Sequence, residues 1–209
     1  MKVVIIEGCD NLGKTTLITN LIKKYNDKYD ILVKHSGKPE KCDDPLKYQY
    51  LQFFNETKSL QHEKMNSSAN KELLVIYDRF VQGEYVWGHL YRNNRIEDIR
   101  DNCVSPIVNH MNLWIGEDNI VTILLDAPAE FIYNNDDGKS FCSDLDKAEA
   151  LNKINKQRDL FYLSTMKPEF SCFKRRAVYD VYDKTNNTFK LEDNICDGVS
   201  KLIEKEINL

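Results

Sequence analysis

Residues 8–15 read Gly-Cys-Asp-Asn-Leu-Gly-Lys-Thr and match the pattern G-x-x-x-x-G-K-[ST]. In this pattern Gly8 and Gly13 adopt backbone angles that turn successive amide N–H groups inward, where they bind phosphate oxygens. The ammonium of Lys14 reaches the outer phosphates, and the hydroxyl of Thr15 is a ligand for Mg²⁺. The spacing therefore predicts a loop that holds the phosphates of ATP together with Mg²⁺.

The segments on either side of this loop are the elements that such a site needs. Residues 3–6 are a short apolar run, and residues 14–25 carry apolar side chains at helical spacing. A buried strand would lead into the loop, and a helix would leave it with the positive end of its dipole facing the phosphates. The residues expected to bind the ATP phosphates are Gly8, Asn11, Leu12, Gly13, Lys14, Thr15 and Thr16.

The rest of the chain repeats this alternation of strand and helix. Further apolar runs occupy residues 31–33, 73–77 and 120–125, with a weaker one at 178–182, and helical spacing recurs at 144–163 and 194–207. Continuous apolar runs are typical of parallel strands that are buried on both faces. We therefore predict an α/β fold, a phosphate-loop three-layer sandwich with a five-stranded parallel sheet and helices on both faces. Ligands of such sheets bind at the carboxyl ends of the strands.

Composition limits the partners of the protein. The chain has 209 residues, 42% of them hydrophobic, and a formal net charge of -4. An acidic chain has no general attraction for nucleic acid polymers or membranes, and no apolar run has the ~20 residues that a membrane helix needs. Six cysteines without a C-x-x-C pair predict free thiols in a reducing compartment. We expect one domain over residues 1–209, a cytoplasmic location and small-molecule nucleotides as partners.

Four stretches, in this order, resemble the thymidylate kinase family. Residues 7–16 are similar to its E-G-x-D-x-x-G-K-[ST]-T, and residues 78–80 (Asp-Arg-Phe) to its D-R-[YF]. Residues 124–128 (Leu-Leu-Asp-Ala-Pro) resemble its L-L-D-x-P. Residues 145–163 resemble its lid and the helix that follows. The resemblance covers most of the chain and implies phosphate transfer from ATP to a deoxynucleoside monophosphate.

The resemblance also implies roles for single residues. Arg79 would hold the phosphate of the acceptor, Asp78 would hold the Mg²⁺ water shell or orient the acceptor, and Asp10 would contact the sugar 3′-hydroxyl. A planar guanidinium suits phosphate, so the chemistry of Arg79 agrees with this role. Other interpretations remain open: a surface ion pair for Arg79, a helix N-cap for Asp78 and a loop brace for Asp10.

The acceptor base is expected in the region of residues 36–72. Phe54 and Lys58, one helical turn apart, resemble the family's phenylalanine and arginine that stack on the base and touch its edge. Phe53 competes for the first role, and both phenylalanines also suit a core. Trp87 fits an aromatic position near the sugar, with core packing as the alternative. For the adenine of ATP the sequence suggests residues 184–187.

The chain departs from the family in its catalytic cations and in its base pocket. Asn11 stands where some members have a catalytic arginine, so this role would pass to Lys147 or Lys139 in a mobile lid at residues 134–147. Gly83 replaces a small polar residue that reads the base. The acceptor is therefore expected to be dTMP or a related pyrimidine deoxynucleotide, including 5-modified ones.

Two other functions are compatible with the same loop. A deoxynucleoside kinase would need a base near the second strand, where the nearest acid is Glu40. A nucleotide-binding module without turnover usually carries a guanine-reading N-K-x-D, which this sequence lacks. Because thymidylate kinases are commonly dimers, the resemblance also implies a homodimer.

Overall fold

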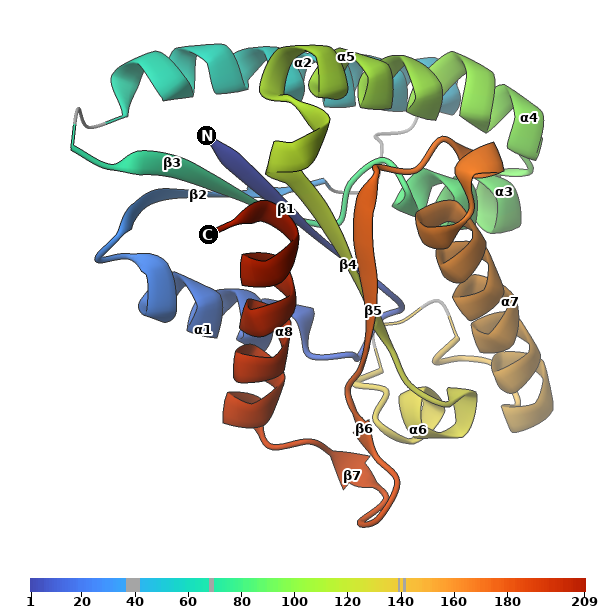
Figure 1. Ribbon diagram of the computed structural model, residues 1–209. Helices are drawn as coiled ribbons and strands as arrows, with labels where there is room; N and C mark the ends of the chain where they lie inside the picture. Colours follow the sequence, from blue (N-terminus) through green and yellow to red (C-terminus); the bar gives the residue numbers. More distant parts are fainter. Residues whose placement is uncertain (37–41, 68–69, 139, 141) are drawn as a thin grey trace.

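The centre of the computed structural model, which describes residues 1–36, 42–67, 70–138, 140 and 142–209, is a parallel five-stranded sheet. Its order is β2-β3-β1-β4-β5 (Figure 1). The predicted α/β class and parallel sheet are confirmed. The strands are β1 (Lys2–Glu7), β2 (Tyr29–His35), β3 (Glu72–Asp78), β4 (Ile120–Asp126) and β5 (Arg175–Asp180).

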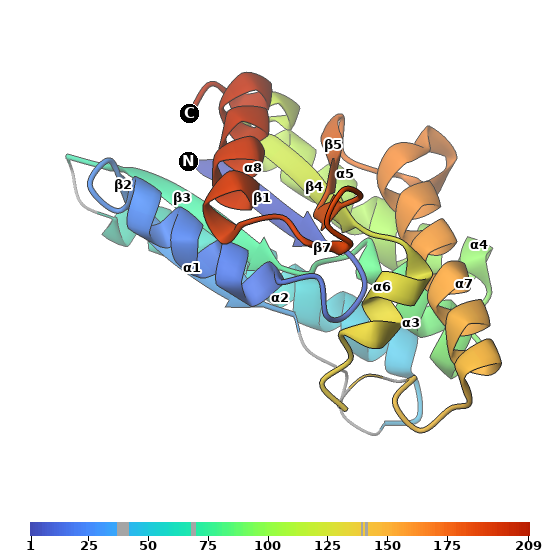
Figure 2. The same ribbon diagram turned by 90° about the horizontal axis from the view of Figure 1, so that it is seen from below.

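Helices cover both faces of the sheet. On one face lie α1 (Lys14–Tyr25) and α8 (Glu192–Ile207), and on the other α2 (Pro45–Asn66) and α5 (Ser105–Ile115) (Figures 1 and 2). The central strand β1 serves both layers because successive side chains of a strand point to opposite faces. Val4 packs in the cluster that contains Leu17 of α1, whereas Val3 packs in the cluster that contains Phe53 of α2.

The remaining elements lie around this sandwich. Helix α7 packs against α3 and α6, and the three helices lie together in Figure 2. The two short strands β6 and β7 form a separate antiparallel hairpin. These elements are α3 (Gly83–Arg92), α4 (Ile96–Ile99), a π-helix (Arg100–Val104), α6 (Ala129–Asn134), α7 (Lys147–Met166), β6 (Tyr182–Asp183) and β7 (Thr188–Phe189), with 3₁₀ turns at Glu117–Asn119 and Pro168–Phe170.

The structure corrects two element boundaries and adds one hairpin. The fifth strand is Arg175–Asp180 and not 178–182, because an edge strand that pairs only with β4 tolerates arginines at its start. The helix predicted over 144–163 begins at Lys147, because the Asp146 carboxylate accepts a hydrogen bond from the Glu149 N–H at 2.9 Å and caps the helix. Strands of two residues leave no periodic pattern, so the β6–β7 hairpin was missed.

Topology places the phosphate loop at the point where the strand order reverses. β3 and β4 flank β1 on its two sides, so the chain builds the sheet outward from β1 in both directions. In such sheets the crevice beside the carboxyl end of the central strand is the ligand site. Among the described helices, none is long and apolar enough to cross a membrane. All six cysteines are free thiols, as the sequence predicts.

Candidate active site

The loop between β1 and α1 has the backbone that the glycine pattern predicts. Gly8 has φ 138° and Gly13 has φ 72°, both in the region that glycine adopts readily. At Gly8 a Cβ would lie 2.5 Å from the carbonyl oxygen of Leu125, so a side chain is excluded there. Asn11 adopts φ 61°, which asparagine tolerates better than most residues.

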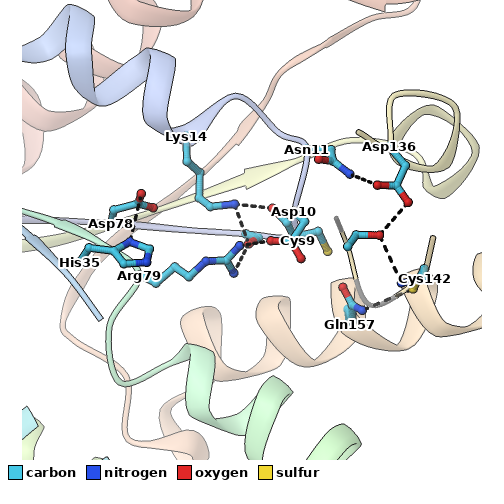
Figure 3. Close-up of polar contacts among 12 residues, drawn as sticks. Cys9, Asp10, Asn11, Lys14, His35, Asp78, Arg79, Asp136, Cys142 and Gln157 are labelled. Atoms are coloured by element: carbon cyan, nitrogen blue, oxygen red, sulfur yellow. Dashed lines mark hydrogen bonds and ion pairs between the residues drawn. The ribbon is translucent and has the colours of Figure 1, made fainter. Parts of the chain in front are cut away.

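Lys14 lies inside the loop. Its side chain is 7% exposed, and its ammonium donates to the carbonyl oxygen of Gly8 at 3.2 Å and to that of Cys9 (Figure 3). Burial, with the positive charge of Arg79 beside it, lowers the pKa of Lys14 to about 8. The ammonium is thus held by carbonyl oxygens where an anionic phosphate would be a stronger partner.

Arg79 comes from the end of β3 and reaches the same loop. Its guanidinium pairs with the carboxylate of Asp10, donates to the carbonyl oxygen of Gly8 at 3.3 Å and lies 5.1 Å from the ring of Trp87. The backbone of Arg79 has φ 70°, a conformation that costs a non-glycine residue about 1–3 kcal/mol. Such strain persists where the surrounding structure fixes the residue, as it does at many binding sites.

A cavity of about 340 Å³ opens over these residues. Both cations, Lys14 and Arg79, line it, together with residues from the ends of β2 and β3 and from the segment before α7. The complete lining is Asp10, Asn11, Leu12, Gly13, Lys14, Thr15, Thr16, His35, Asp78, Arg79, Asp137 and Ser140. All the residues predicted to bind ATP line this cavity except Gly8. Arg79, predicted for the acceptor phosphate, and Asp78, predicted for the metal, line it as well.

The cavity suits a magnesium ion that is carried in by phosphates. Among the described residues, no group of three His, Cys, Asp or Glu side chains could hold a metal without them. Thr15 and Asp78 both line the cavity, and Asp78 Oδ1 is buried without a hydrogen-bond partner. Two protein oxygens leave positions for phosphate oxygens and water, which is the usual coordination of Mg²⁺.

His35, at the end of β2, is a residue that sequence analysis did not select. Its Nδ1 lies 3.4 Å from Asp78 Oδ2 (Figure 3). The ring is exposed and lines the cavity. The register of the sheet explains this pair, because His35 and Asp78 are Cα partners at the carboxyl ends of neighbouring strands.

The predicted lid segment is fastened to the phosphate loop by Asp136. Its carboxylate accepts a hydrogen bond from Asn11 Nδ2 at 3.1 Å (Figure 3). It also accepts hydrogen bonds from Ser140 Oγ at 2.7 Å and Ser143 Oγ at 2.8 Å. Burial opposes ionisation of Asp136, but these hydrogen bonds outweigh it and hold its pKa below the usual value. Asn11, which replaces a catalytic arginine in the resemblance, thus connects the loop to the lid.

Lys147, one of the two lysines predicted as the lid cation, does not line the cavity. Lys147 begins α7 and lies 6.0 Å from the ring of Tyr133, outside the residues that line the cavity. Lys139, like Glu40, lies outside the described residues. A catalytic role for either lysine stays a prediction.

Phe54 and Lys58 also lie away from the cavity. Phe54 packs 5.5 Å from His110 of α5, and Lys58 Nζ lies 5.0 Å from the Phe54 ring. Phe53 is 2% exposed and packs 5.2 Å from Phe80 in the core. The core interpretation therefore holds for Phe53, and contact of Phe54 and Lys58 with the acceptor base stays a prediction.

Gly83 lies beside Trp87 and Glu7, at ordinary van der Waals distance for an added Cβ. A Cβ at Gly83 would meet Trp87 Nε1 at 3.4 Å and Glu7 Oε2 at 3.5 Å. Trp87 is half-buried against Phe161 and lies beside Arg79. A modified pyrimidine base as acceptor stays a prediction.

A second cavity, of about 170 Å³, adjoins the other side of the phosphate loop. Phe189 and Ile195 give it an apolar wall and Asn20 a polar one; the other lining residues are Gly13, Thr16, Leu17, Lys190 and Glu192. Residues 184–187, the region suggested for adenine, form the turn of the β6–β7 hairpin just before this cavity.

Comparisons with known proteins agree with this architecture. No family model matches the chain, and no curated protein matches it. Among solved structures the chain is similar to the YorR protein from Bacillus subtilis, whose crystal structure is in complex with phosphorylated GDP. The TM-score is 0.60 at 18% sequence identity, over 99% of this chain and 98% of YorR. The protein has a phosphate-loop α/β fold.

Sequence reasoning missed three residues besides His35. Glu7 is buried at the end of β1, and Asp126 and Arg158 form a bidentate pair at 2.8 and 2.9 Å between β4 and α7. The signal for Glu7 and Asp126 was present, because each is an acid at the carboxyl end of a buried apolar run.

Proposed function

We propose that the protein is a kinase that transfers the γ-phosphate of ATP to a deoxynucleoside monophosphate. The observation that carries this proposal is that Lys14 and Arg79 donate to one atom, the carbonyl oxygen of Gly8. One cation belongs to the donor loop and the other comes from a different strand. Two phosphate groups bound to these cations would lie next to each other in the 340 Å³ cavity.

The residues of the chain act by positioning and by neutralising charge, which is what phosphate transfer requires. Lys14 and the loop N–H groups hold the outer phosphates of ATP. Arg79 exchanges the Asp10 carboxylate for the acceptor phosphate, whose planar O–P–O edge matches the guanidinium. Asp10, once released, can accept a hydrogen bond from the sugar hydroxyl. Thr15 and Asp78 would hold Mg²⁺, whose charge would neutralise the transferring phosphate.

No strong base is needed, because the oxygen of an acceptor phosphate is already an anion. The donor base fits the 170 Å³ cavity beside Gly13 and Thr16, where Phe189 offers an aromatic surface. A bound phosphorylated nucleotide in YorR supports nucleotide binding by this fold. The resemblance to thymidylate kinases favours dTMP or a related pyrimidine deoxynucleotide as acceptor, in a homodimer.

A panel of deoxynucleoside monophosphates tests the proposal. Each is offered with ATP and Mg²⁺, and ADP release is followed by a coupled assay. At least one monophosphate should accelerate ADP release well above the rate without acceptor, and dTMP should lead the panel. If none accelerates release while ATP still binds, the proposed transfer is wrong.

The pair of His35 and Asp78 favours a second candidate, a kinase that phosphorylates a hydroxyl group. A neutral hydroxyl needs a general base, and an imidazole whose Nδ1 faces a carboxylate presents Nε2 as that base. His35 would thus be the general base near the second strand, the role for which the sequence offered Glu40. Adding deoxynucleosides to the panel decides between the two: turnover of nucleosides that His35→Gln abolishes would favour the second candidate.

A further inference from the structure

Three consecutive residues at the end of β1 all bind the segment that carries Arg79. The carbonyl oxygen of Ile6 accepts the Arg79 N–H at 3.0 Å, and that of Gly8 accepts Arg79 Nη1 at 3.3 Å. Between them, Glu7 Oε1 accepts the N–H of Phe80 at 2.8 Å and of Gly83 at 3.3 Å. Glu7 is the one side chain among these acceptors.

The Glu7 carboxylate takes the place of a side-chain cap at the start of α3. Helix α3 begins at Gly83, and its N-cap residue, Gln82, makes no side-chain capping bond. The Gly83 N–H is shared between the carbonyl oxygen of Phe80 at 3.1 Å and Glu7 Oε1 at 3.3 Å. A negative charge at this end of a helix is stabilising, and Glu7 supplies it from a neighbouring strand. It also fixes Phe80, the residue directly after the left-handed Arg79.

Glu7 is fully buried, so its charge is sensitive to its surroundings. Burial raises its pKa to about 7, although the Phe80 N–H, Arg79, the Gly83 N–H and Lys14 all favour the ionised form. Oε2 has no hydrogen-bond partner and faces the same point beside Gly83 that Trp87 Nε1 reaches. Protonation of Glu7 would weaken its bonds to the turn and remove a negative charge beside both cations.

We propose that Glu7 is a positioning residue for the acceptor phosphate: its ionised carboxylate holds the turn that aims Arg79 into the cavity. The inference rests on the proposed function, because Arg79 is the acceptor ligand there. Glu7 itself touches no substrate. Acceptor binding would therefore depend on the protonation of a residue beneath the site, whereas ATP binding would depend on it much less.

The test compares Glu7→Gln with the wild type, using dTMP and MgATP between pH 6 and 8.5. Glutamine keeps the shape and a weaker acceptor but not the charge. At pH 8 we expect the KM for dTMP to rise about tenfold, which corresponds to ~1.4 kcal/mol, with the KM for ATP within twofold. The wild-type KM for dTMP should rise as pH falls below about 7. The dTMP phosphate also titrates near pH 6 and contributes equally to both proteins, so the difference between them is the signal.

Glu84→Gln is the matched control. Glu84 is also buried, and burial raises its pKa to about 6, but its carboxylate pairs with Arg92 at the far end of α3. This variant should lose stability and leave the KM for dTMP unchanged. If Glu7→Gln and Glu84→Gln behave alike, Glu7 has a structural role and the inference is overturned.

Trp87 gives a readout that does not need turnover. In a Trp114→Phe background the remaining tryptophan lies beside both Arg79 and Glu7. Its fluorescence should titrate with a midpoint near pH 7, and Glu7→Gln should abolish the transition. A transition that survives in Glu7→Gln would overturn the inference. Absence of turnover with every monophosphate would instead overturn the proposed function, while this titration would still report on the turn.

Discussion

Arg79 forms an ion pair with Asp10, a residue of the phosphate loop 69 positions earlier in the chain. The pair connects the end of β3 to the loop after β1, so it joins the two sides of the cavity that we propose for the acceptor and the donor. An acceptor phosphate must compete with Asp10 for the guanidinium. Because a phosphate monoester carries more negative charge than a carboxylate, it is the stronger partner.

Replacing Arg79 should impair use of the acceptor much more than use of ATP. In Arg79→Ala the acceptor loses a bidentate, charge-assisted contact, and we expect its KM to rise about 10- to 100-fold. Steady-state kinetics with either substrate varied measure this. Arg95→Ala, which removes an arginine that is 73% exposed and paired with Glu97, is the control and should leave both KM values unchanged. Equal effects of the two variants would refute the role of Arg79.

Lys14→Met should lower the activity of the protein and raise its stability at pH 7. Loss of the ammonium should reduce turnover at least about a hundredfold, as loss of a donor to a reacting group does in other enzymes. The folded pKa of Lys14 is lowered to about 8 from 10.5, so the folded state disfavours the proton. This penalty is fully present below pH 8 and disappears as pH rises to about 10.5. Replacement by methionine should therefore raise the free energy of unfolding at pH 7 by up to ~3 kcal/mol.

Urea unfolding of Lys14→Met and the wild type at pH 7 and pH 10 measures this difference. The gain from methionine should be larger at pH 7 than at pH 10. A variant that is less stable than the wild type at pH 7 would contradict the burial of a charged Lys14.

Asp136→Ala should release the lid segment from the phosphate loop. Asn11, Ser140 and Ser143 each lose an acceptor, so amide exchange at Gly138 and Cys142 should become faster. Transfer should slow, and ATP hydrolysis without acceptor should increase, because closure excludes water from the reacting phosphate. Unchanged exchange and unchanged hydrolysis would show that Asp136 does not fasten the lid.

The same carboxylate makes the segment sensitive to acid. The pKa of Asp136 is lower in the folded state than in the unfolded chain, so its contribution is present above the unfolded pKa. It is lost as pH falls through the folded pKa. Exchange at Gly138 should therefore accelerate relative to the core in acid, and less so in Asp136→Ala.

Two glycines of the phosphate loop should respond differently to the same change. Gly8→Ala places a methyl group 2.5 Å from the Leu125 carbonyl oxygen and must displace backbone. Gly13→Ala meets nothing within 4 Å and costs only its left-handed conformation, about 1–2 kcal/mol. Thermal unfolding of both variants should show the larger loss for Gly8→Ala. A larger loss for Gly13→Ala would contradict the loop geometry.

The sequence by itself determined the parts of this protein that depend on near neighbours. The spacing of Gly8, Gly13 and Lys14 predicts the loop, and continuous apolar runs predict the parallel strands. Helix α1 lies at the residues that its periodicity predicts. These inferences succeed because hydrogen bonding, helix spacing and burial of a strand are decided within a few residues.

Only the tertiary structure decided which distant side chains meet. Arg79 reaches Asp10 because β1 and β3 pair with Ile6 opposite Asp78, and Asn11 meets Asp136 across 125 positions. The same cause places Phe54 beside His110, because α2 packs against α5. Glu7 is part of a motif in the sequence, but only the fold brings its carboxylate to the N–H of Phe80, 73 residues away. Strand register and helix packing are long-range properties, and no local spacing encodes them.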